Sequence, residues 1–435
     1  MKILLLMTAA TLLSLNALRA QESTDAAPSA DVDSGSDAAA LPEEPQMPTL
    51  APPTTPDEAQ SMEETLYGAG EAQNEAPAGA VAQSRSWNVN FHAGAETRYD
   101  SNVFISANHP ESDVLTDLIA GAGFTLGDYT TRQNNYLITD YTGIGELFGN
   151  YSSQDAYNQK ASAETQLLFG HLTLRADLTF DDVEEDNIDI GTRAQSEFYI
   201  GHASARYDIS DKSYVQVTGQ VTVANYQRYL DSDDERGGIS FDYLPDPSVT
   251  VGLGAMAGVL HVQDSPSQTY EQLLASLLID FTDKFTMTAS AGGEDRQTST
   301  DGDLYTPVVD LTADYKPFEE LDLSLSGFRQ VENSAYYAGS DFISTGLSAS
   351  VKYDLSARFT LMLQGGYGNC NYRDVSAGPG VSRNDNYLFV RPTFRYIASP
   401  NCNVDLYYFY RDNSSTLATS SFTDTQVGGD VTFTY

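Results

Sequence analysis

The sequence has few of the residues on which several common protein classes depend. Its 435 residues include two cysteines, one tryptophan and five histidines. Basic residues are also scarce, with 23 Lys and Arg against 61 Asp and Glu. Because binding to nucleic acid requires Lys and Arg to neutralise phosphates, we expect no nucleic-acid partner. The acidic excess has two open interpretations, a soluble surface or a cation-selective interior.

The two cysteines, Cys370 and Cys402, fall at opposite ends of two different segments of alternating hydrophobicity. An extended chain rises about 3.3 Å per residue, which places the two thiols far apart. A disulfide requires the two Cα atoms to lie within about 7 Å. We therefore predict that both cysteines are free.

Residues suited to catalysis or metal binding are also sparse. The histidines show no metal-ligand spacing, and no serine lies in a nucleophile motif; they are His92, His109, His171, His202 and His261. The acidic run 231–235 could offer oxygen ligands to Ca²⁺, but it lacks the glycine and spacing of a dedicated loop, and we interpret it as solvated charge. We predict no metal, no cofactor and no enzymatic activity, with a barrel-shaped hydrolase as the less favoured alternative.

Long apolar runs are absent beyond the first 20 residues. Lys2, the apolar run 3–15 and the small residue Ala20 predict a secretory signal peptide over residues 1–20. A spanning helix takes about 20 apolar residues, and no later segment is long enough. Lipid leaves no backbone group unpaired, so insertion into a membrane would have to occur as a closed β-barrel.

Residues 21–86 have a composition unlike the rest of the chain. They contain 13 acidic residues, one basic residue and eight of the 17 prolines. Such a segment buries too little apolar surface to offset the entropy of ordering, and we predict a disordered periplasmic arm. A capping pattern at 55–58 allows a short helix to residue 66, either transient or docked under the following domain.

Residues 87–435 repeat one unit, which is about ten residues of alternating apolar and polar character followed by a turn. Side chains of a strand alternate between its two faces, so each segment is apolar on one side only. We predict 18 strands, give or take two, at residues 89–99, 115–127, 136–147, 156–169, 172–181, 194–209, 214–226, 237–244, 249–262, 268–281, 285–297, 304–315, 321–331, 341–354, 359–372, 386–397, 403–411 and 422–435. An even count returns both termini to the same side, which we expect to be the periplasm.

The connections alternate between short and long, as in outer-membrane barrels. The short ones are 170–171, 210–212, 245–247, 282–284, 356–358 and 399–401; the long ones include 230–236, 299–303, 333–339, 374–384 and 412–421. An aromatic residue precedes nearly every short turn and ends the chain, which predicts a ring at one membrane interface: Phe169, Tyr207, Tyr243, Phe281, Tyr315, Tyr353, Tyr396 and Tyr435. A partner ring is suggested by Tyr99, Tyr226, Tyr270, Tyr305, Phe342, Tyr387 and Tyr410.

Charged residues on the polar faces must avoid lipid, where Lys or Arg at mid-bilayer costs about 2–4 kcal/mol. We therefore predict that the following residues face an aqueous lumen: Arg175, Asp177, Glu294, Arg296, Asp322, Arg391, Arg395, Asp405 and Arg411. These charges either create a transverse field that guides a solute or simply pair within the wall. Inward aromatics at Tyr136, Phe328, Phe389 and Tyr407 could serve as platforms for sugar rings or pack against an inward loop or the arm.

Short motifs add a family resemblance over residues 87–435. The segment 99–104 reads YDSNVF, and the repeated units 206–210 and 352–356 read RYDIS and KYDLS before their turns. In these features the chain resembles the β-barrel porin 2 type of outer-membrane protein. The resemblance implies an outer-membrane barrel, often associated with exopolysaccharide export, and no catalytic residues. The last strand differs from the usual assembly signal in having Asp430 where glycine is common, while Phe433 and Tyr435 retain the aromatic pair.

These observations predict an all-β, antiparallel transmembrane barrel in the outer membrane of a Gram-negative cell. Its lumen would pass hydrophilic solutes or an exopolysaccharide chain, and outer-membrane lipid and the barrel-insertion machinery, through Phe433 and Tyr435, would be its partners. The alternative function is a non-conducting structural or surface-display barrel, blocked by loops or by the arm. The alternative fold is a long soluble β-solenoid or sandwich, which gives no reason for the alternating turns.

Overall fold

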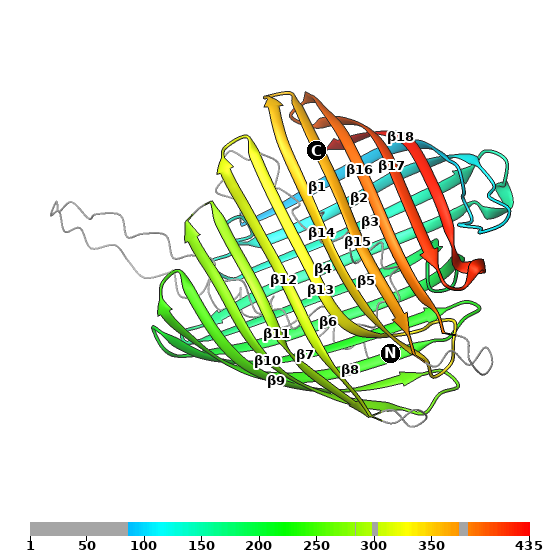
Figure 1. Cartoon of the computed structure of the whole chain (residues 1–435). Coiled ribbons are helices and arrows are strands. Elements are labelled where there is room, and N and C mark those ends of the chain that lie inside the picture. Colours follow the sequence, from blue (N-terminus) through cyan, green and yellow to red (C-terminus); the bar gives the residue numbers. More distant parts are fainter. Residues whose placement is uncertain (1–85, 283, 298–302, 374–381) are drawn as a thin grey trace.

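The computed structural model describes residues 86–282, 284–297, 303–373 and 382–435. The predicted signal peptide, and the predicted arm except for Ser86, lie outside these residues. Eighteen strands form one sheet (Figure 1): β1 (Trp87–Asp100), β2 (Asp113–Gly127), β3 (Tyr136–Phe148), β4 (Ala156–Phe169), β5 (Leu172–Asn187), β6 (Thr192–Ser210), β7 (Ser213–Tyr226), β8 (Ser232–Asp246), β9 (Val249–Val262), β10 (Gln268–Thr282), β11 (Phe285–Gln297), β12 (Leu304–Phe318), β13 (Leu321–Asn333), β14 (Asp341–Ser356), β15 (Phe359–Tyr372), β16 (Asn384–Ser399), β17 (Cys402–Ser415) and β18 (Phe422–Thr434).

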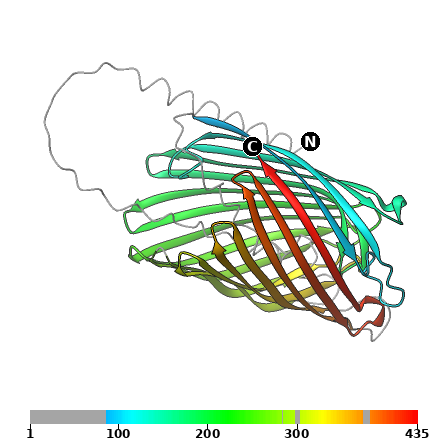
Figure 2. The ribbon, with the colours of Figure 1, turned by 90° about the horizontal axis from the view of Figure 1, so that it is seen from above.

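The sheet is closed on itself. Each strand pairs antiparallel with its sequence neighbours, and β1 pairs with both β2 and β18. Ala93, for example, lies opposite Ala120 on one side and Phe433 on the other. Figure 2 shows β18, in red, beside β1, in blue. The prediction of an 18-stranded antiparallel barrel is confirmed, and closure leaves no sheet edge to be satisfied in lipid.

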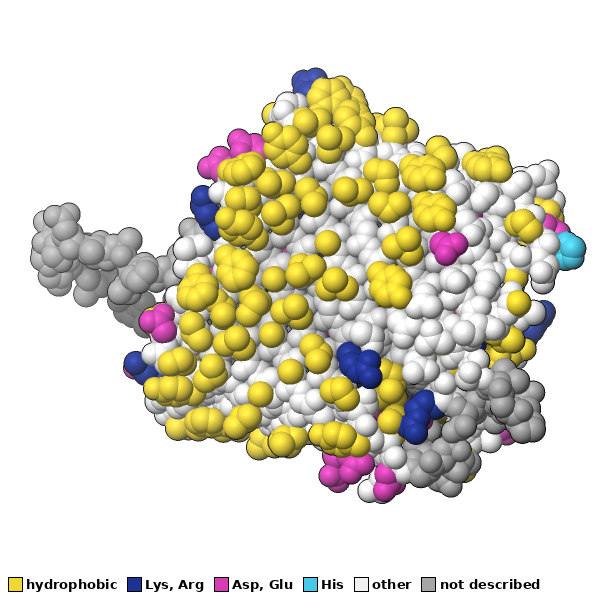
Figure 3. Space-filling view, in the orientation of Figure 1, with side chains coloured by type: hydrophobic (Ala, Val, Ile, Leu, Met, Phe, Trp, Pro, Cys, Tyr) yellow, Lys and Arg dark blue, Asp and Glu magenta, His cyan; other side chains and the backbone are white. Residues whose placement is uncertain are grey.

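The outer wall is apolar, as the alternating pattern predicted. Leu253 on β9 and Leu273 on β10 are 66% and 68% exposed, whereas Gln272, the neighbour of Leu273, is buried toward the inside. Figure 3 shows hydrophobic side chains scattered over the wall, with charged groups mostly toward its margins. Such a surface is stable where hydrocarbon replaces water.

The YDSN motif closes the barrel between its first and last strands. The Asn102 backbone N–H donates to Asp100 Oδ1 at 2.7 Å, and the Ser101 hydroxyl donates to Asp424 Oδ1 of β18 at 2.9 Å. The Asn102 side chain also donates to the Thr423 carbonyl at 3.3 Å. The segment that carried the family resemblance therefore fastens the β1–β2 connection to β18.

Two strand boundaries differ most from prediction. β5 continues to Asn187 rather than ending at residue 181, and β8 begins at Ser232 rather than at residue 237. Both extensions are polar except for Val183, so no alternating hydrophobic pattern marks them. The predicted solvated loop at 231–235 is thus largely strand, and Asp234 is buried, accepting a hydrogen bond from the Tyr270 hydroxyl at 2.7 Å.

Two further expectations can be compared with the described residues. Cys370 and Cys402 are free, as predicted. The partner ring is wrong for four members, because Tyr226, Tyr270, Phe342 and Tyr387 are buried on the inner face. These four aromatic side chains pack inside the lumen. The sequence had suggested a membrane interface because of their distance from the short turns. None of the described helices is long and apolar enough to cross a membrane.

Candidate channel constriction

The β5–β6 hairpin leaves the barrel wall near its tip. In the backbone ladder, β5 pairs with β4 only as far as Asp182, and β6 pairs with β7 only from Ser196. Residues 183–194 pair only within their own hairpin. We call residues 183–194 the inner hairpin, because their contacts lie inside the barrel.

Two ion pairs show the direction in which the inner hairpin points. Asp186 Oδ2 lies 2.5 Å from Arg411 Nη2 on β17, which is six strands away around the ring. Arg193 of β6 pairs with Glu146 of β3, which lies on the way around the ring from β5 to β17. Side chains can reach β17 from β5 only across the interior, so the inner hairpin lies over the lumen.

The tip of the inner hairpin meets the connection between β13 and β14, which lies nearly opposite in the ring. Asp189 accepts a hydrogen bond from the Ser334 hydroxyl at 2.9 Å and another from the Ala335 N–H at 2.8 Å. The Ala335 carbonyl in turn accepts from the Leu230 N–H of the β7–β8 connection at 2.9 Å. Three connections therefore join above the lumen.

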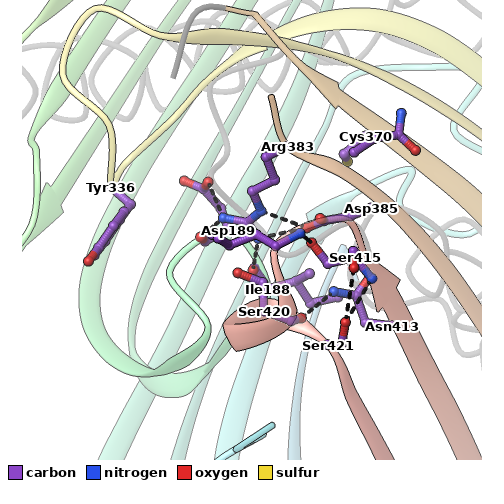
Figure 4. Close-up of polar contacts among 12 residues, drawn as sticks. Ile188, Asp189, Tyr336, Cys370, Arg383, Asp385, Asn413, Ser415, Ser420 and Ser421 are labelled. Atoms are coloured by element: carbon purple, nitrogen blue, oxygen red, sulfur yellow. Dashed lines mark hydrogen bonds and ion pairs between the residues drawn. The ribbon is translucent and has the colours of Figure 1, made fainter. Parts of the chain in front are cut away.

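Arg383, just before β16, holds the tip in place (Figure 4). Its Nη1 donates to the Asp189 carbonyl at 2.6 Å, and its Nη2 donates to the Ile188 carbonyl at 2.8 Å. Its Nε donates to Asp385 Oδ2 at 2.9 Å, and the guanidinium lies 4.4 Å from the ring centre of Tyr372. We call Ile188, Asp189, Ser334, Ala335 and Arg383 the lumen bridge.

The β13–β14 hairpin also leans inward. Asp341 at the start of β14 accepts from Gln268 Nε2 of β10 at 3.2 Å and lies 3.9 Å from Arg296 of β11. In the ring, β10 and β11 are four and three positions away from β14, respectively. The first residues of β12, 304–308, are correspondingly separated from β13, because the ladder between the two strands begins only at Val309 opposite Arg329. The two hairpins thus approach each other from opposite walls.

Burial of the tip changes the chemistry of Asp189. Removal from water raises the pKa of its carboxyl above the ordinary range, and the nearby Arg383 charge and the Ser334 hydrogen bond offset only part of this effect. The bridge therefore contains a carboxylate whose charge is costly in the closed arrangement.

The predicted lumen residues occupy the inner face in several distinct settings. Arg296 and Glu294 are almost fully buried and lie 2.7 Å apart. Arg395 pairs with Asp405 at 2.7 Å, and Asp322 pairs with Lys316 at 3.1 Å. The remaining contacts are Arg175 to Gln166 at 2.6 Å, Asp177 to His202 at 2.6 Å, Arg391 over the Tyr407 ring at 4.3 Å and Arg411 to Asp424 at 2.9 Å. Their part in solute selection stays a prediction.

Several constriction residues were not identified from the sequence. Asp189, Ser334 and Arg383 lie in connections, where no periodic pattern shows which way a side chain points. The available signal was indirect: residues 182–193 are mostly polar, with Val183, Ile188 and Ile190 as the exceptions, and such a hairpin is unsuitable for a wall against lipid. Among the described residues, no group of three or more His, Cys, Asp or Glu is arranged to hold a metal ion.

The predicted aromatic ring lies at the turn-side ends of the even-numbered strands, apart from Tyr435, which follows β18. Phe169, Tyr207, Tyr243, Phe281, Tyr315 and Tyr353 are exposed on the outer face, Tyr396 is half-buried and Tyr435 is exposed. Tyr435 also pairs with Phe91 of β1 through two backbone hydrogen bonds of 2.8 Å. The role of the ring at a membrane interface remains a prediction.

Comparison with known families gives a match over part of the chain. Residues 266–435, less than half of the chain, match the family model described as "Putative beta-barrel porin 2". The resemblance predicted from the motifs is confirmed over these residues. No match to a curated protein was found.

Several solved structures have a limited similarity to this chain, with TM-scores below 0.5. OccAB4 from Acinetobacter baumannii has a TM-score of 0.45 and 11% identity, covering 80% of this chain and 98% of that chain. The outer membrane protein OpdK from Pseudomonas aeruginosa has a TM-score of 0.43 and 12% identity, covering 80% and 99%. The siderophore receptor PirA from the same organism has a TM-score of 0.37 and 11% identity, covering 80% of each chain. The fold of the present chain is established by its own strand pairing.

The family match, the closed sheet and the apolar outer wall together place the chain in the Gram-negative outer membrane as a porin-like β-barrel.

Proposed function

We propose that this protein is a gated channel for hydrophilic solutes, and that the lumen bridge is its gate. An 18-stranded barrel is wide enough for an aqueous interior, and the inner face carries many charged residues. The observation that carries the proposal is the set of polar contacts that Asp189 and Arg383 make with connections from opposite walls.

The chemistry of the bridge suits a reversible closure. Hydrogen bonds contribute about 0.5–1.5 kcal/mol each, and those to charged groups about 1.5–3 kcal/mol, because water competes for the same groups. A handful of such contacts, offset by the entropy of ordering the tip, gives an energy difference of a few kcal/mol. A difference of that size leaves a minor open population of about 0.1–10%.

A second candidate function is a non-conducting structural barrel. The same bridge favours it, because two hairpins that meet above the lumen could form a permanent plug. The two candidates differ in whether the bridge opens. Passage of an exopolysaccharide chain is a finer form of the channel proposal, supported by the family resemblance and by the polar interior.

Single-channel recording in planar bilayers separates the candidates. We expect the mature wild-type protein to open briefly, and Arg383→Ala to remain open for a roughly tenfold larger fraction of time, because truncating a buried charged partner costs several kcal/mol. Arg358→Ala is the matched control, since Arg358 is exposed in the β14–β15 turn. A folded barrel that carries no current in any of the three proteins would establish the structural barrel instead.

Other features are part of the same proposal. We place both termini on the periplasmic side, where the short turns lie, and assign Phe433 and Tyr435 to recognition by the insertion machinery. Proteolysis of intact cells, with tags inserted in the β13–β14 connection and in the β14–β15 turn, would test this orientation, because only the former should be cleaved from outside.

A further inference from the structure

A line of aromatic side chains runs down one wall of the lumen. Tyr372 on β15, Tyr387 and Phe389 on β16, and Tyr407 and Phe409 on β17 all face inward and are buried. We call these five residues the aromatic stripe. Tyr407 lies opposite Thr393, six residues along β16 from Tyr387, so the stripe extends about 20 Å from the loop end toward the middle of the barrel.

At least two rings of the stripe lie flat against the wall. A Cβ added to Gly366 would lie 2.5 Å from the Phe389 ring, and one added to Gly428 would lie 2.6 Å from the Tyr407 ring. Each ring therefore occupies the space above a glycine of the neighbouring strand. The opposite faces of both rings are covered in this closed arrangement, since Phe389 and Tyr407 are 2% and 6% exposed and the Arg391 guanidinium lies 4.3 Å from the Tyr407 ring centre. A ligand therefore reaches these rings only when the groups that cover them move aside.

Arginines accompany the rings along the stripe. The guanidinium of Arg383 lies 4.4 Å from the ring centre of Tyr372, that of Arg391 lies 4.3 Å from Tyr407, and that of Arg411 lies 5.8 Å from Phe409. Flat rings stack against the C–H faces of sugars, and guanidinium groups donate paired hydrogen bonds to carboxylates. Together they match the chemistry of an acidic sugar chain.

Two buried acceptors beside the stripe have no hydrogen-bond partner among the described residues. They are Asp385 Oδ1 and Asn413 Oδ1, and both side chains are almost completely inaccessible. An unpaired buried acceptor is costly, and a hydroxyl donor would satisfy it. A sugar supplies such donors at many positions.

The upper end of the stripe is occupied by the tip of the inner hairpin. Ile188 packs in the same apolar cluster as the stripe, and its carbonyl and that of Asp189 accept from Arg383. The tip thus places the apolar side chain of Ile188 beside two carbonyl oxygens. A sugar ring would place an apolar C–H face beside its own oxygens in the same way. A ligand and the tip cannot both occupy this position.

We infer that the aromatic stripe is a binding track for an acidic oligosaccharide, and that the tip of the inner hairpin competes with the ligand for its upper end. This inference rests on the proposed channel and names the ligand class and the regulation of its gate. Binding favours the open bridge, because the ligand displaces Ile188 and takes over the guanidinium of Arg383.

Calorimetric titration of the detergent-solubilised full-length protein with oligogalacturonate tests the track, with maltohexaose as the neutral comparison. We expect oligogalacturonate to bind more tightly than maltohexaose. Tyr407→Ala should weaken binding by roughly tenfold, as for a central aromatic contact. Tyr157→Ala is the matched control, because Tyr157 is exposed on the outer face. Arg391→Gln should remove most of the preference for the acidic chain.

The competing tip is tested by Asp189→Ala, which removes the contacts to Ser334 and Ala335 and should tighten binding of oligogalacturonate. Equal affinity for the two oligosaccharides, or equal losses in Tyr407→Ala and Tyr157→Ala, would overturn the track. Unchanged affinity in Asp189→Ala would overturn the competition. If oligogalacturonate binds but no current flows in bilayers, only the channel proposal fails; if current flows without binding, only the track fails.

Discussion

At the scale of single residues, the gate depends on a few polar groups in connections. Asp189 is buried between opposite walls and accepts from Ser334 and Ala335, while Arg383 donates to the backbone of the tip. Desolvation raises the pKa of Asp189, so its charged form opposes closure. Protonation removes this opposition.

This shift predicts that the gate closes more firmly in acid. The carboxyl of Asp189 has a raised pKa when the bridge is closed and an ordinary one, about 3.9, when the tip is in water. The closed state therefore takes up a proton as the pH falls through the raised pKa, and the open fraction should decrease between that pKa and the ordinary one. Asp189→Asn should lose this dependence, as measured by bilayer recording over a series of pH values from alkaline to acid. An unchanged pH profile in Asp189→Asn would show that another group is responsible.

At the scale of elements, the inner hairpin is a strand pair that lacks a continuous apolar face and is therefore unsuitable as a wall against lipid. Its pairing with β4 ends at Asp182 and its pairing with β7 begins at Ser196, which frees the tip to cross the lumen. The β13–β14 hairpin does the same from the other side. The two elements meet through side chains and one N–H, without a shared ladder.

Joining the two hairpins covalently should hold the gate shut. Asp189 and Ser334 have side-chain oxygens 2.9 Å apart, so cysteines at the two positions lie within reach of a short bis-methanethiosulfonate cross-linker. The double variant Asp189→Cys/Ser334→Cys should carry little current after treatment with this cross-linker and regain it after reduction with dithiothreitol. Each single-cysteine variant serves as a control and should respond to neither treatment. Current that persists in the cross-linked protein would show that solutes pass elsewhere.

At the scale of the whole molecule, the barrel separates hydrocarbon outside from polar groups inside. Leu253 on β9 is exposed on the outer face near mid-wall, and Ser276 on the adjacent strand β10 faces inward. The two positions lie on neighbouring strands and differ mainly in the face they occupy.

Substitution by lysine should therefore have unequal effects on the free energy of unfolding from lipid. Leu253→Lys should destabilise the barrel by about 2–4 kcal/mol, because the charge is placed near the bilayer midplane. Ser276→Lys should cost less than about 1 kcal/mol, because its side chain reaches the polar interior. Urea titration in phosphatidylcholine vesicles measures both. Equal costs at the two positions would contradict an outer wall in contact with lipid.

The sequence by itself determined the strand number, the antiparallel order and the outer face. Alternation with period 2 is local and recurs in every strand, and lipid imposes one requirement on every outward position, so residues such as Leu253, Phe281 and Phe433 could be assigned without knowledge of their neighbours. The free state of Cys370 and Cys402 followed in the same way from their positions along separate strands.

Only the tertiary structure decided what fills the interior. Asp189, Ser334 and Arg383 are separated by up to 194 residues in the chain, and their meeting depends on where two hairpins leave the wall. The inward position of Tyr270 and Tyr387, which the sequence suggested for an interface, was likewise fixed by the packing of the lumen. Local patterns report which face a residue occupies; contacts across a barrel depend on distances that only the closed ring establishes.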